Sequence, residues 1–167
     1  MKTSGLSKNL ESILAAMRQA CIETYGERLV TVAVYGSVGR GTAGPDSDVD
    51  VLVVADSLPQ GRTARIKEFV AVEKRFAQLL RKANFSREPP FLSPVFKTRG
   101  SVRQGSPLFF DMTQDARILF DRQGFFTNEL SRLRKRLRSL GAKRIWQGSA
   151  WYWDLKPDYR PGEEFEI

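Results

Sequence analysis

Two aspartates that lie two residues apart, at the start of an apolar run, are the residues of this chain best placed to do chemistry. Asp48 and Asp50 flank Val49 and lead into the run Val51 to Ala55. In a β-strand, residues two apart point to the same face, so both carboxylates are expected to project together while the valines enter the core. Two anions on one face of a buried strand repel each other and lose solvation, and a bound cation is the usual compensation.

A metal ion and a phosphate-binding turn are both expected around this aspartate pair. The chain has no histidine, and carboxylate oxygens alone suit Mg²⁺ or Mn²⁺. The preceding apolar run, Leu29 to Tyr35, is rich in β-branched residues and predicts a strand buried on both faces. Gly36 and Ser37 then begin a glycine-rich turn that extends to Gly44, where backbone amides can approach an anion. Phosphate on the amides and metal on the acids together imply a nucleotide.

Three other motifs share residues with this stretch, and the sequence context excludes each. Three glycines of the turn have the spacing of a dinucleotide-binding fingerprint, but Pro45 and a second strand follow where that motif opens a helix. Asp46 and the aspartate pair resemble the start of an EF-hand loop, but Val51 stands where that loop requires glycine. The Gly-Lys-Ser/Thr of a Walker-type phosphate loop is absent.

Seven positions of the stretch form one pattern: Gly36, Ser37, Arg40, Gly41, Ser47, Asp48 and Asp50. In its strand, turn, strand context this pattern resembles the nucleotidyltransferase superfamily that includes DNA polymerase β, and within it the minimal nucleotidyltransferase domains. The resemblance covers residues 5–121 and implies an α/β fold with a mixed β-sheet covered by helices. It implies that Asp48 and Asp50 are catalytic metal ligands and that Gly36 and Ser37 contact the β and γ phosphates. Ser47 and Arg40 complete the implied nucleotide-binding set, with Arg40 neutralising the leaving pyrophosphate.

The sequence departs from the superfamily on the expected third strand, Phe91 to Lys97. Polymerase β-like enzymes usually place a third carboxylate there, whereas this chain has Ser93 followed by Pro94. Because proline cannot donate to a ladder, this strand is expected either to lie at a sheet edge or to begin late. Asp111, which lies between apolar residues, is the alternative source of a third acid, although residues 107–115 equally suit a short helix. The third acid helps to hold a second metal and orients the attacking hydroxyl, so its absence favours slow transfer or nucleotide binding alone.

The remaining segments are expected to support this site. Amphipathic spacing predicts a helix that follows an N-cap at Ser7 and ends at Gly26, and a second helix over residues 63–83. Residues 116–120 are expected to form a further strand. Residues 1–123 are expected to form the nucleotidyltransferase-like domain. Residues 124–167 are expected to pack on that domain as an extension, with a basic helix from Gly124 to Gly141 and a tryptophan-rich tail that folds a hairpin over residues 144–154.

Composition restricts the class of protein. The 167 residues, 41% hydrophobic and 28% charged, are ordinary for a globular domain. No apolar run approaches the roughly 20 residues that a membrane span needs, so no membrane partner is expected. The single cysteine, Cys21, lies at helical spacing for core packing and excludes an intrachain disulfide, which fits a cytoplasmic location. The formal net charge of +8 predicts a surface that attracts phosphate groups or an acidic partner.

The resemblance implies Mg²⁺- or Mn²⁺-dependent transfer of a nucleoside monophosphate from a nucleoside triphosphate, with ATP as the favoured donor, to a hydroxyl acceptor. Minimal members modify antibiotics or proteins, and some are antitoxins that nucleotidylate a helical toxin; the residues do not select among these acceptors. The alternative is a catalytically weak or inactive nucleotide-binding module, or an antitoxin-like subunit, that binds a partner protein through the basic helix and the tail. Aromatic residues beside basic ones also suit nucleic acid, which is the less favoured partner.

Overall fold

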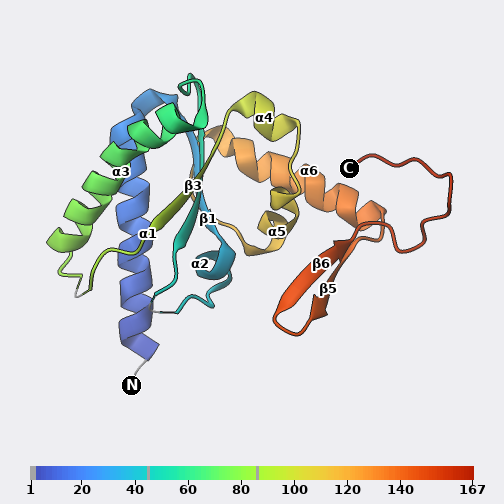
Figure 1. Cartoon of the computed structure of the whole chain (residues 1–167), viewed down its shortest axis with the longest axis horizontal. Coiled ribbons are helices and arrows are strands. Elements are labelled where there is room, and N and C mark those ends of the chain that lie inside the picture. The colour runs from blue at the N-terminus through green and yellow to red at the C-terminus, as the bar shows by residue number, and fades with distance from the viewer. Residues whose placement is uncertain (1–2, 45, 86) are drawn as a thin grey trace.

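The computed structural model describes residues 3–44, 46–85 and 87–167, and its centre is a four-stranded mixed sheet between two groups of helices (Figure 1). The strands are β1 (Leu29–Tyr35), β2 (Val49–Ala55), β3 (Leu92–Lys97) and β4 (Arg117–Asp121). Their order across the sheet is β3-β2-β1-β4. β1 is antiparallel to β2 and β4, whereas β3 runs parallel to β2. The α/β fold with a mixed sheet that the sequence predicts is confirmed.

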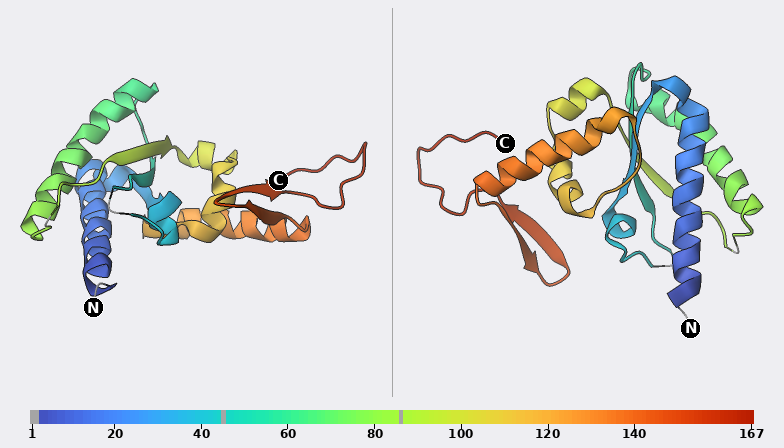
Figure 2. Two further views of the ribbon diagram at one scale, coloured as in Figure 1. Left: turned by 60° about the horizontal axis from the view of Figure 1, so that its bottom comes forward. Right: turned by 180° about the vertical axis from the view of Figure 1, so that it is seen from behind.

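Two long helices, α1 (Thr3–Tyr25) and α3 (Arg62–Lys82), cover one face of the sheet and lie side by side (Figures 1 and 2). The 3-10 helix Gly26–Arg28 connects α1 to β1. The apolar sides of α1 and α3 pack against the strands and form a first core, which includes Met17, Cys21, Val51, Phe69 and Phe76. Cys21 packs in this core, as its helical spacing predicts. Its burial raises the pKa of the thiol to about 12.

The opposite face is covered by α4 (Arg99–Arg103), α5 (Leu108–Asp115) and α6 (Phe125–Ser139), the last reached from β4 through the 3-10 helix Arg122–Gly124. In this second core the rings of Phe109 and Phe126 meet edge to face, with centroids 5.4 Å apart. The solvent-exposed side of α6 carries Arg132, Arg134, Lys135, Arg136 and Arg138. In the described part of the chain, no helix is both long enough and apolar enough to cross a membrane.

Successive residues of β2 face the two cores in turn. Val49, Val51 and Val53 pack in the first core with α1 and α3, whereas Leu52 and Val54 pack in the second. Asp50 therefore lies on the face of the sheet that α5 and α6 cover. The two-residue period that the sequence shows thus decides on which side of the sheet the aspartate stands.

The chain continues after α6 into a hairpin of β5 (Lys143–Gln147) and β6 (Ala150–Asp154), a two-stranded sheet separate from the main one. Gly148, with φ +62°, starts its two-residue turn. The hairpin and the following residues 155–167 project away from the main sheet, as both views of Figure 2 show. The tail returns to α6, where Arg136 Nε donates a 2.7 Å hydrogen bond to the carbonyl oxygen of Glu166.

Candidate active site

The glycine-rich turn after β1 begins with a short helix, α2 (Gly36–Arg40), where the sequence predicts an open turn. A Schellman motif ends this helix: the N–H of Thr42 donates to the carbonyl of Ser37 at 2.9 Å, and the N–H of Gly41 donates to that of Val38 at 3.2 Å. Gly41 has the left-handed conformation, φ +76°, that this cap requires. The hydrogen bonds close the turn into a compact unit beside the start of β2.

Gly36 brings the backbone of this turn against the carboxylate of Asp50. The register of β1 and β2 places Tyr35 opposite Asp50, and Gly36 follows with φ +62°. A Cβ atom at position 36 would lie 2.0 Å from Asp50 Oδ2, so a larger residue would displace the carboxylate. Tyr35 is a neighbour that the sequence analysis missed: burial, then the charge of Asp50, raises its pKa to about 12, so its hydroxyl stays protonated at neutral pH.

Among the described residues, no cationic side chain pairs directly with Asp48 or Asp50. Asp48 is exposed just before β2, and Asp50 is half-buried. Neither side chain forms an ion pair or a hydrogen bond within residues 9–44, 46–85 and 87–167. Burial and then the neighbouring Asp48 raise the pKa of the Asp50 carboxyl above its ordinary value, while the positive charge of Arg40 lowers it. An additional cation would stabilise the charged form of both acids.

The donors at this place suit a hard divalent cation held by two carboxylates. Oxygen ligands without imidazole or thiolate are what Mg²⁺ and Mn²⁺ prefer. Among the described residues, no group of three or more His, Cys, Asp or Glu side chains could hold a metal ion by itself. An ion on Asp48 and Asp50 would therefore need further oxygen ligands, which phosphate groups and water can supply.

Ser93 occupies the position on β3 that neighbours Asp50. β3 lies at the edge of the sheet, one of the two outcomes that Pro94 predicts, and pairs in parallel with β2 so that Ser93 is opposite Asp50. Val95, two residues further on, packs against the second core, so Ser93 shares the face of Asp50. Where polymerase β-like enzymes usually carry a third acid, this chain therefore presents a hydroxyl group.

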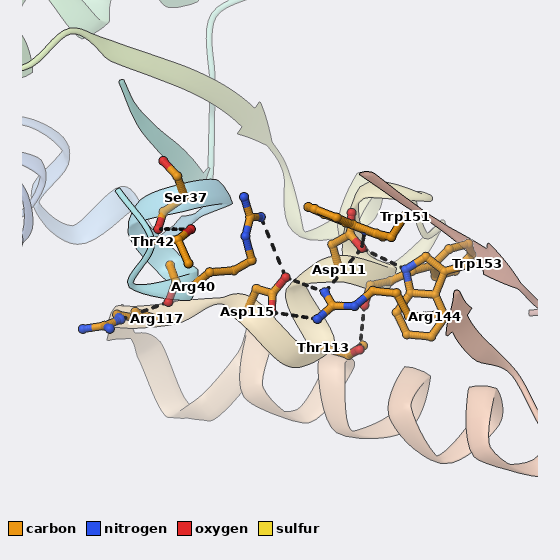
Figure 3. A network of polar contacts seen from close by, with 12 residues as sticks. Ser37, Arg40, Thr42, Asp111, Thr113, Asp115, Arg117, Arg144, Trp151 and Trp153 are labelled. Atoms are coloured by element: carbon orange, nitrogen blue, oxygen red, sulfur yellow. Dashed lines mark hydrogen bonds and ion pairs between the residues drawn. The ribbon is translucent and has the colours of Figure 1, made fainter. Parts of the chain in front are cut away.

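Asp111, the alternative source of a third acid, accepts hydrogen bonds from two tryptophans of the hairpin. It lies in α5, and its Oδ1 accepts a hydrogen bond from Trp151 Nε1 at 2.7 Å and another from Trp153 Nε1 at 2.8 Å (Figure 3). Through these two indoles the carboxylate anchors the hairpin on α5. The tryptophans and Asp111 are far apart in the sequence, so no local spacing could indicate this contact.

Ser47 holds the loop that leads to Asp48. Its Oγ accepts a 2.9 Å hydrogen bond from the N–H of Gly44. A cavity of about 440 Å³ borders the same loop, and its apolar lining includes Val38 and Val49. Because Val49 faces the first core, the cavity opens on the other face of the sheet from Asp50. The aspartate pair and this cavity are therefore separate places.

Arg40 extends from the end of α2 toward α5 and the hairpin (Figure 3). The carbon of its guanidinium lies 4.7 Å from the ring centroid of Trp151, and its NH1 lies 3.9 Å from Asp115 Oδ2. Neither Trp151 nor Asp115 is among the residues that the sequence analysis selects. The one sequence signal that could have indicated Asp115 is its four-residue spacing from Asp111, which puts both carboxylates on one face of a helix.

Comparisons with known proteins reveal relatives over most of the chain. The family model of the nucleotidyltransferase domain matches residues 14–97. The protein of Methanocaldococcus jannaschii named "Putative protein adenylyltransferase MJ1305" is 31% identical over 127 residues, which are 76% of this chain and 82% of that protein. "Protein adenylyltransferase MntA" of Thermococcus cleftensis is 36% identical over 73 residues, 44% of this chain and 67% of its own.

A weaker likeness is found among solved structures. A crystal structure of a toxin–antitoxin with AMP-PNP is similar with a TM-score of 0.42 and 19% identity, over 72% of this chain and 87% of that chain. Similarity at this level carries no conclusion about function. The family model spans the glycine-rich turn and the aspartate pair, and it matches half of the chain. The chain therefore belongs to the nucleotidyltransferase domain family, and it is a nucleotidyltransferase.

Proposed function

We propose that the protein transfers AMP from ATP to a hydroxyl group of an acceptor protein. The observation that carries this proposal is the pair Asp48 and Asp50, in which Asp48 raises the pKa of the Asp50 carboxyl and Gly36 of the α2 turn closely approaches Asp50. The names of the two sequence relatives, both protein adenylyltransferases, support ATP as the donor and a protein as the acceptor.

The aspartates and the turn have complementary roles in this proposal. Asp48 and Asp50 would hold a Mg²⁺ or Mn²⁺ ion, which neutralises charge on the phosphates as a Lewis acid. The N–H groups at the start of a helix lack intrahelical partners, so the amides of Gly36 and Ser37 are positioned to donate to the β and γ phosphates. The Ser37 hydroxyl adds a third donor, and Ser47 keeps the loop before Asp48 closed.

The reaction replaces the phosphoanhydride bond of the α-phosphorus by a phosphoester bond to the acceptor. The acceptor oxygen forms a bond to the α-phosphorus, the bond from that phosphorus to the bridging oxygen breaks, and pyrophosphate leaves with the charge that Arg40 neutralises. The chain contributes mainly by positioning and by fixed charge. Because β3 offers Ser93 in place of a carboxylate, the acceptor proton passes to water or to a base on the acceptor, and we expect a low turnover.

Label transfer tests the proposal. The full chain is incubated with α-labelled ATP and Mg²⁺ or Mn²⁺, alone and in host-cell lysate, and labelled proteins are separated on a gel. We expect a labelled band with α-labelled ATP and none with γ-labelled ATP, because the γ phosphate leaves with pyrophosphate. Asp48→Asn and Asp50→Asn should remove the band, whereas Asp111→Asn should keep it. A band that persists in Asp50→Asn would contradict the assignment.

The hydroxyl of Ser93 beside Asp50 favours a second candidate function, a module that binds nucleotide and a partner protein with little or no transfer. In that case ATP would bind in a metal-dependent way that Asp48→Asn abolishes, but no protein would become labelled. The same gel, combined with calorimetric titration of ATP, therefore separates the two functions.

A further inference from the structure

Arg40, which the proposed function assigns to the pyrophosphate, is held by residues from the far end of the chain. Its guanidinium lies against the ring of Trp151 at a cation–π distance, 4.7 Å to the centroid. The Asp115 carboxylate is 3.9 Å away, and the Arg40 side chain is 23% exposed. Its guanidinium donates no hydrogen bond within the part of the chain that the structure describes. The N–H donors of this group therefore remain available to a ligand such as phosphate.

Trp151 is itself fastened to α5 together with the rest of the hairpin. Its Nε1 shares Asp111 Oδ1 with the Nε1 of Trp153, at 2.7 and 2.8 Å. A second attachment joins Arg144 NH1 to Asp115 Oδ2 at 2.6 Å, and the two side chains are only 12% and 10% exposed. Opening a buried ion pair leaves uncompensated charge, so this attachment resists separation of the hairpin from α5.

The ring of Trp151 is the main contact of the Arg40 guanidinium. Asp115 is committed to Arg144, whose nitrogen is 2.6 Å from it, and its 3.9 Å approach to Arg40 is the weaker of the two. The backbone of α2 is fixed independently. Arg117 Nε donates to the carbonyl of Gly39 at 3.1 Å, and a Cβ at Gly39 would lie 2.3 Å from the carbonyl oxygen of Asp115. With the backbone fixed, the position of the guanidinium depends on its side-chain contacts, and Figure 3 shows it between α2 and the hairpin that carries Trp151.

We propose that Trp151 is a positioning residue of the nucleotide site, whose ring holds the Arg40 guanidinium in place before the triphosphate binds. The inference deepens the proposed function and rests on it, because the role of Arg40 in phosphate binding belongs to that function. A preplaced arginine loses less rotamer freedom when the nucleotide arrives, so the ring acts on nucleotide affinity. The hairpin then belongs to the active site although it lies outside the family match at residues 14–97.

A matched pair of variants of the full chain tests this role. Trp151→Leu and Trp153→Leu each remove one indole donor to Asp111, but only the first removes the ring beside Arg40. Trp151→Leu should raise the Kd and KM for ATP about 3- to 30-fold, and it should also lower kcat because Arg40 neutralises the leaving pyrophosphate. Trp153→Leu should leave all three within about twofold, and Trp151→Phe, which keeps an aromatic ring, should restore most of the affinity. An equal rise of Kd in both leucine variants would overturn the proposal.

A double-mutant cycle asks whether Trp151 acts through Arg40. In an Arg40→Met background, Trp151→Leu should change the Kd for ATP by less than about twofold, because the group that the ring positions is gone. An undiminished effect of Trp151→Leu in that background would overturn the positioning role while leaving the proposed function intact. Failure of the proposed function is distinguishable: in that case no protein would be labelled from α-labelled ATP, or Asp48→Asn would leave the metal-dependent affinity for ATP unchanged.

Discussion

The protein contains two pairs of aspartates on regular elements, and their surroundings are opposite. Asp111 and Asp115 lie one helical turn apart on α5, where two indoles and Arg144 compensate them. Asp48 lies just before β2 and Asp50 lies within it, and neither forms an ion pair or a hydrogen bond within the described ranges; only the more distant charge of Arg40 acts on Asp50. The first pair is part of the tertiary structure, whereas the second pair keeps charge that a bound cation would compensate.

This difference shows which acids the fold uses and which it keeps available. A carboxylate whose pKa is raised by burial and by a like charge reduces the stability of the free protein. Groups of this kind cluster at functional sites, where a ligand offsets the cost. Sequence spacing alone marks both pairs as acids on one face of an element, and only their partners separate a binding site from a structural contact.

The largest expected difference between the two pairs is the loss of transfer activity when an aspartate is replaced by asparagine. Asp50→Asn is expected to lower the rate of AMP transfer by about 1000-fold or more, because the charge that holds the metal is lost. Asp111→Asn keeps an oxygen that can accept from the indoles, so we expect a loss of at most about tenfold. Initial rates with α-labelled ATP, on variants whose circular dichroism matches that of the parent, provide the comparison. Equal losses would contradict the assignment of roles.

For the free energy of unfolding we expect the opposite: a change in the α5 pair should cost more than a change in the pair at β2. Asp115→Asn leaves the nearly buried guanidinium of Arg144 without its nearer anion, with only Asp111 at 3.9 Å, and the free energy of unfolding should fall by about 3 kcal/mol. Asp48→Asn removes an exposed like charge and should change it by less than about 0.5 kcal/mol. Urea denaturation of both variants measures the difference. A comparable loss in Asp48→Asn would mean that the strand pair is also a structural contact.

Two glycines with the same backbone conformation give a sharper test of the contact between the turn and Asp50. Gly36 has φ +62° and Gly26 has φ +56°, but only a Cβ at Gly36 would meet Asp50. Each change to alanine should cost about 1 kcal/mol of stability for the left-handed backbone. Only Gly36→Ala should also lower transfer, by about 10- to 100-fold, because it displaces the carboxylate. If Gly26→Ala lowers transfer equally, the loss reflects stability and not the site.

The smallest expected effect concerns pH. The folded-state pKa of Asp50 is raised above 3.8, so the folded protein binds more protons than the unfolded chain between the two pKa values. The stability of the metal-free protein should therefore fall as pH rises through that window and stay lower above it. Asp50→Asn should remove this fall and raise Tm at neutral pH by about 1 to 3 °C. Thermal scans in EDTA, at pH values between the unfolded and folded pKa of Asp50, test the direction of this change. If the Tm of the parent increased with pH more than the Tm of Asp50→Asn, the expected direction would be contradicted.

The sheet and the aspartate pair could be predicted because their signals are local. Continuous β-branched runs indicate buried strands. The alternation of acids and valines around Val49 indicates that Asp48 and Asp50 point to the opposite face of the sheet from the valines. Pro94 likewise predicts that β3 either lies at an edge or begins late, and the structure confirms the edge position. In each case the residues that decide the outcome are neighbours in the sequence.

The remaining features depend on contacts that sequence spacing does not encode. The short helix α2 exists because Gly41 and Thr42 cap it, a local arrangement that a glycine-rich stretch does not distinguish from an open turn. The stacking of Trp151 on Arg40 joins opposite ends of the chain and depends on where α5 places Asp111. Tertiary packing decides such contacts, so periodicity and motif spacing cannot reveal them.

Binding of Mn²⁺ tests most directly whether Asp48 and Asp50 form the metal and nucleotide site. Water-proton relaxation or electron paramagnetic resonance measures bound Mn²⁺ in the presence of a non-hydrolysable ATP analogue, without any need for an acceptor. The parent and Asp111→Asn should bind Mn²⁺ with the same affinity, within about twofold, and Asp50→Asn should weaken it at least about tenfold. Undiminished binding by Asp50→Asn would contradict the assignment of the site.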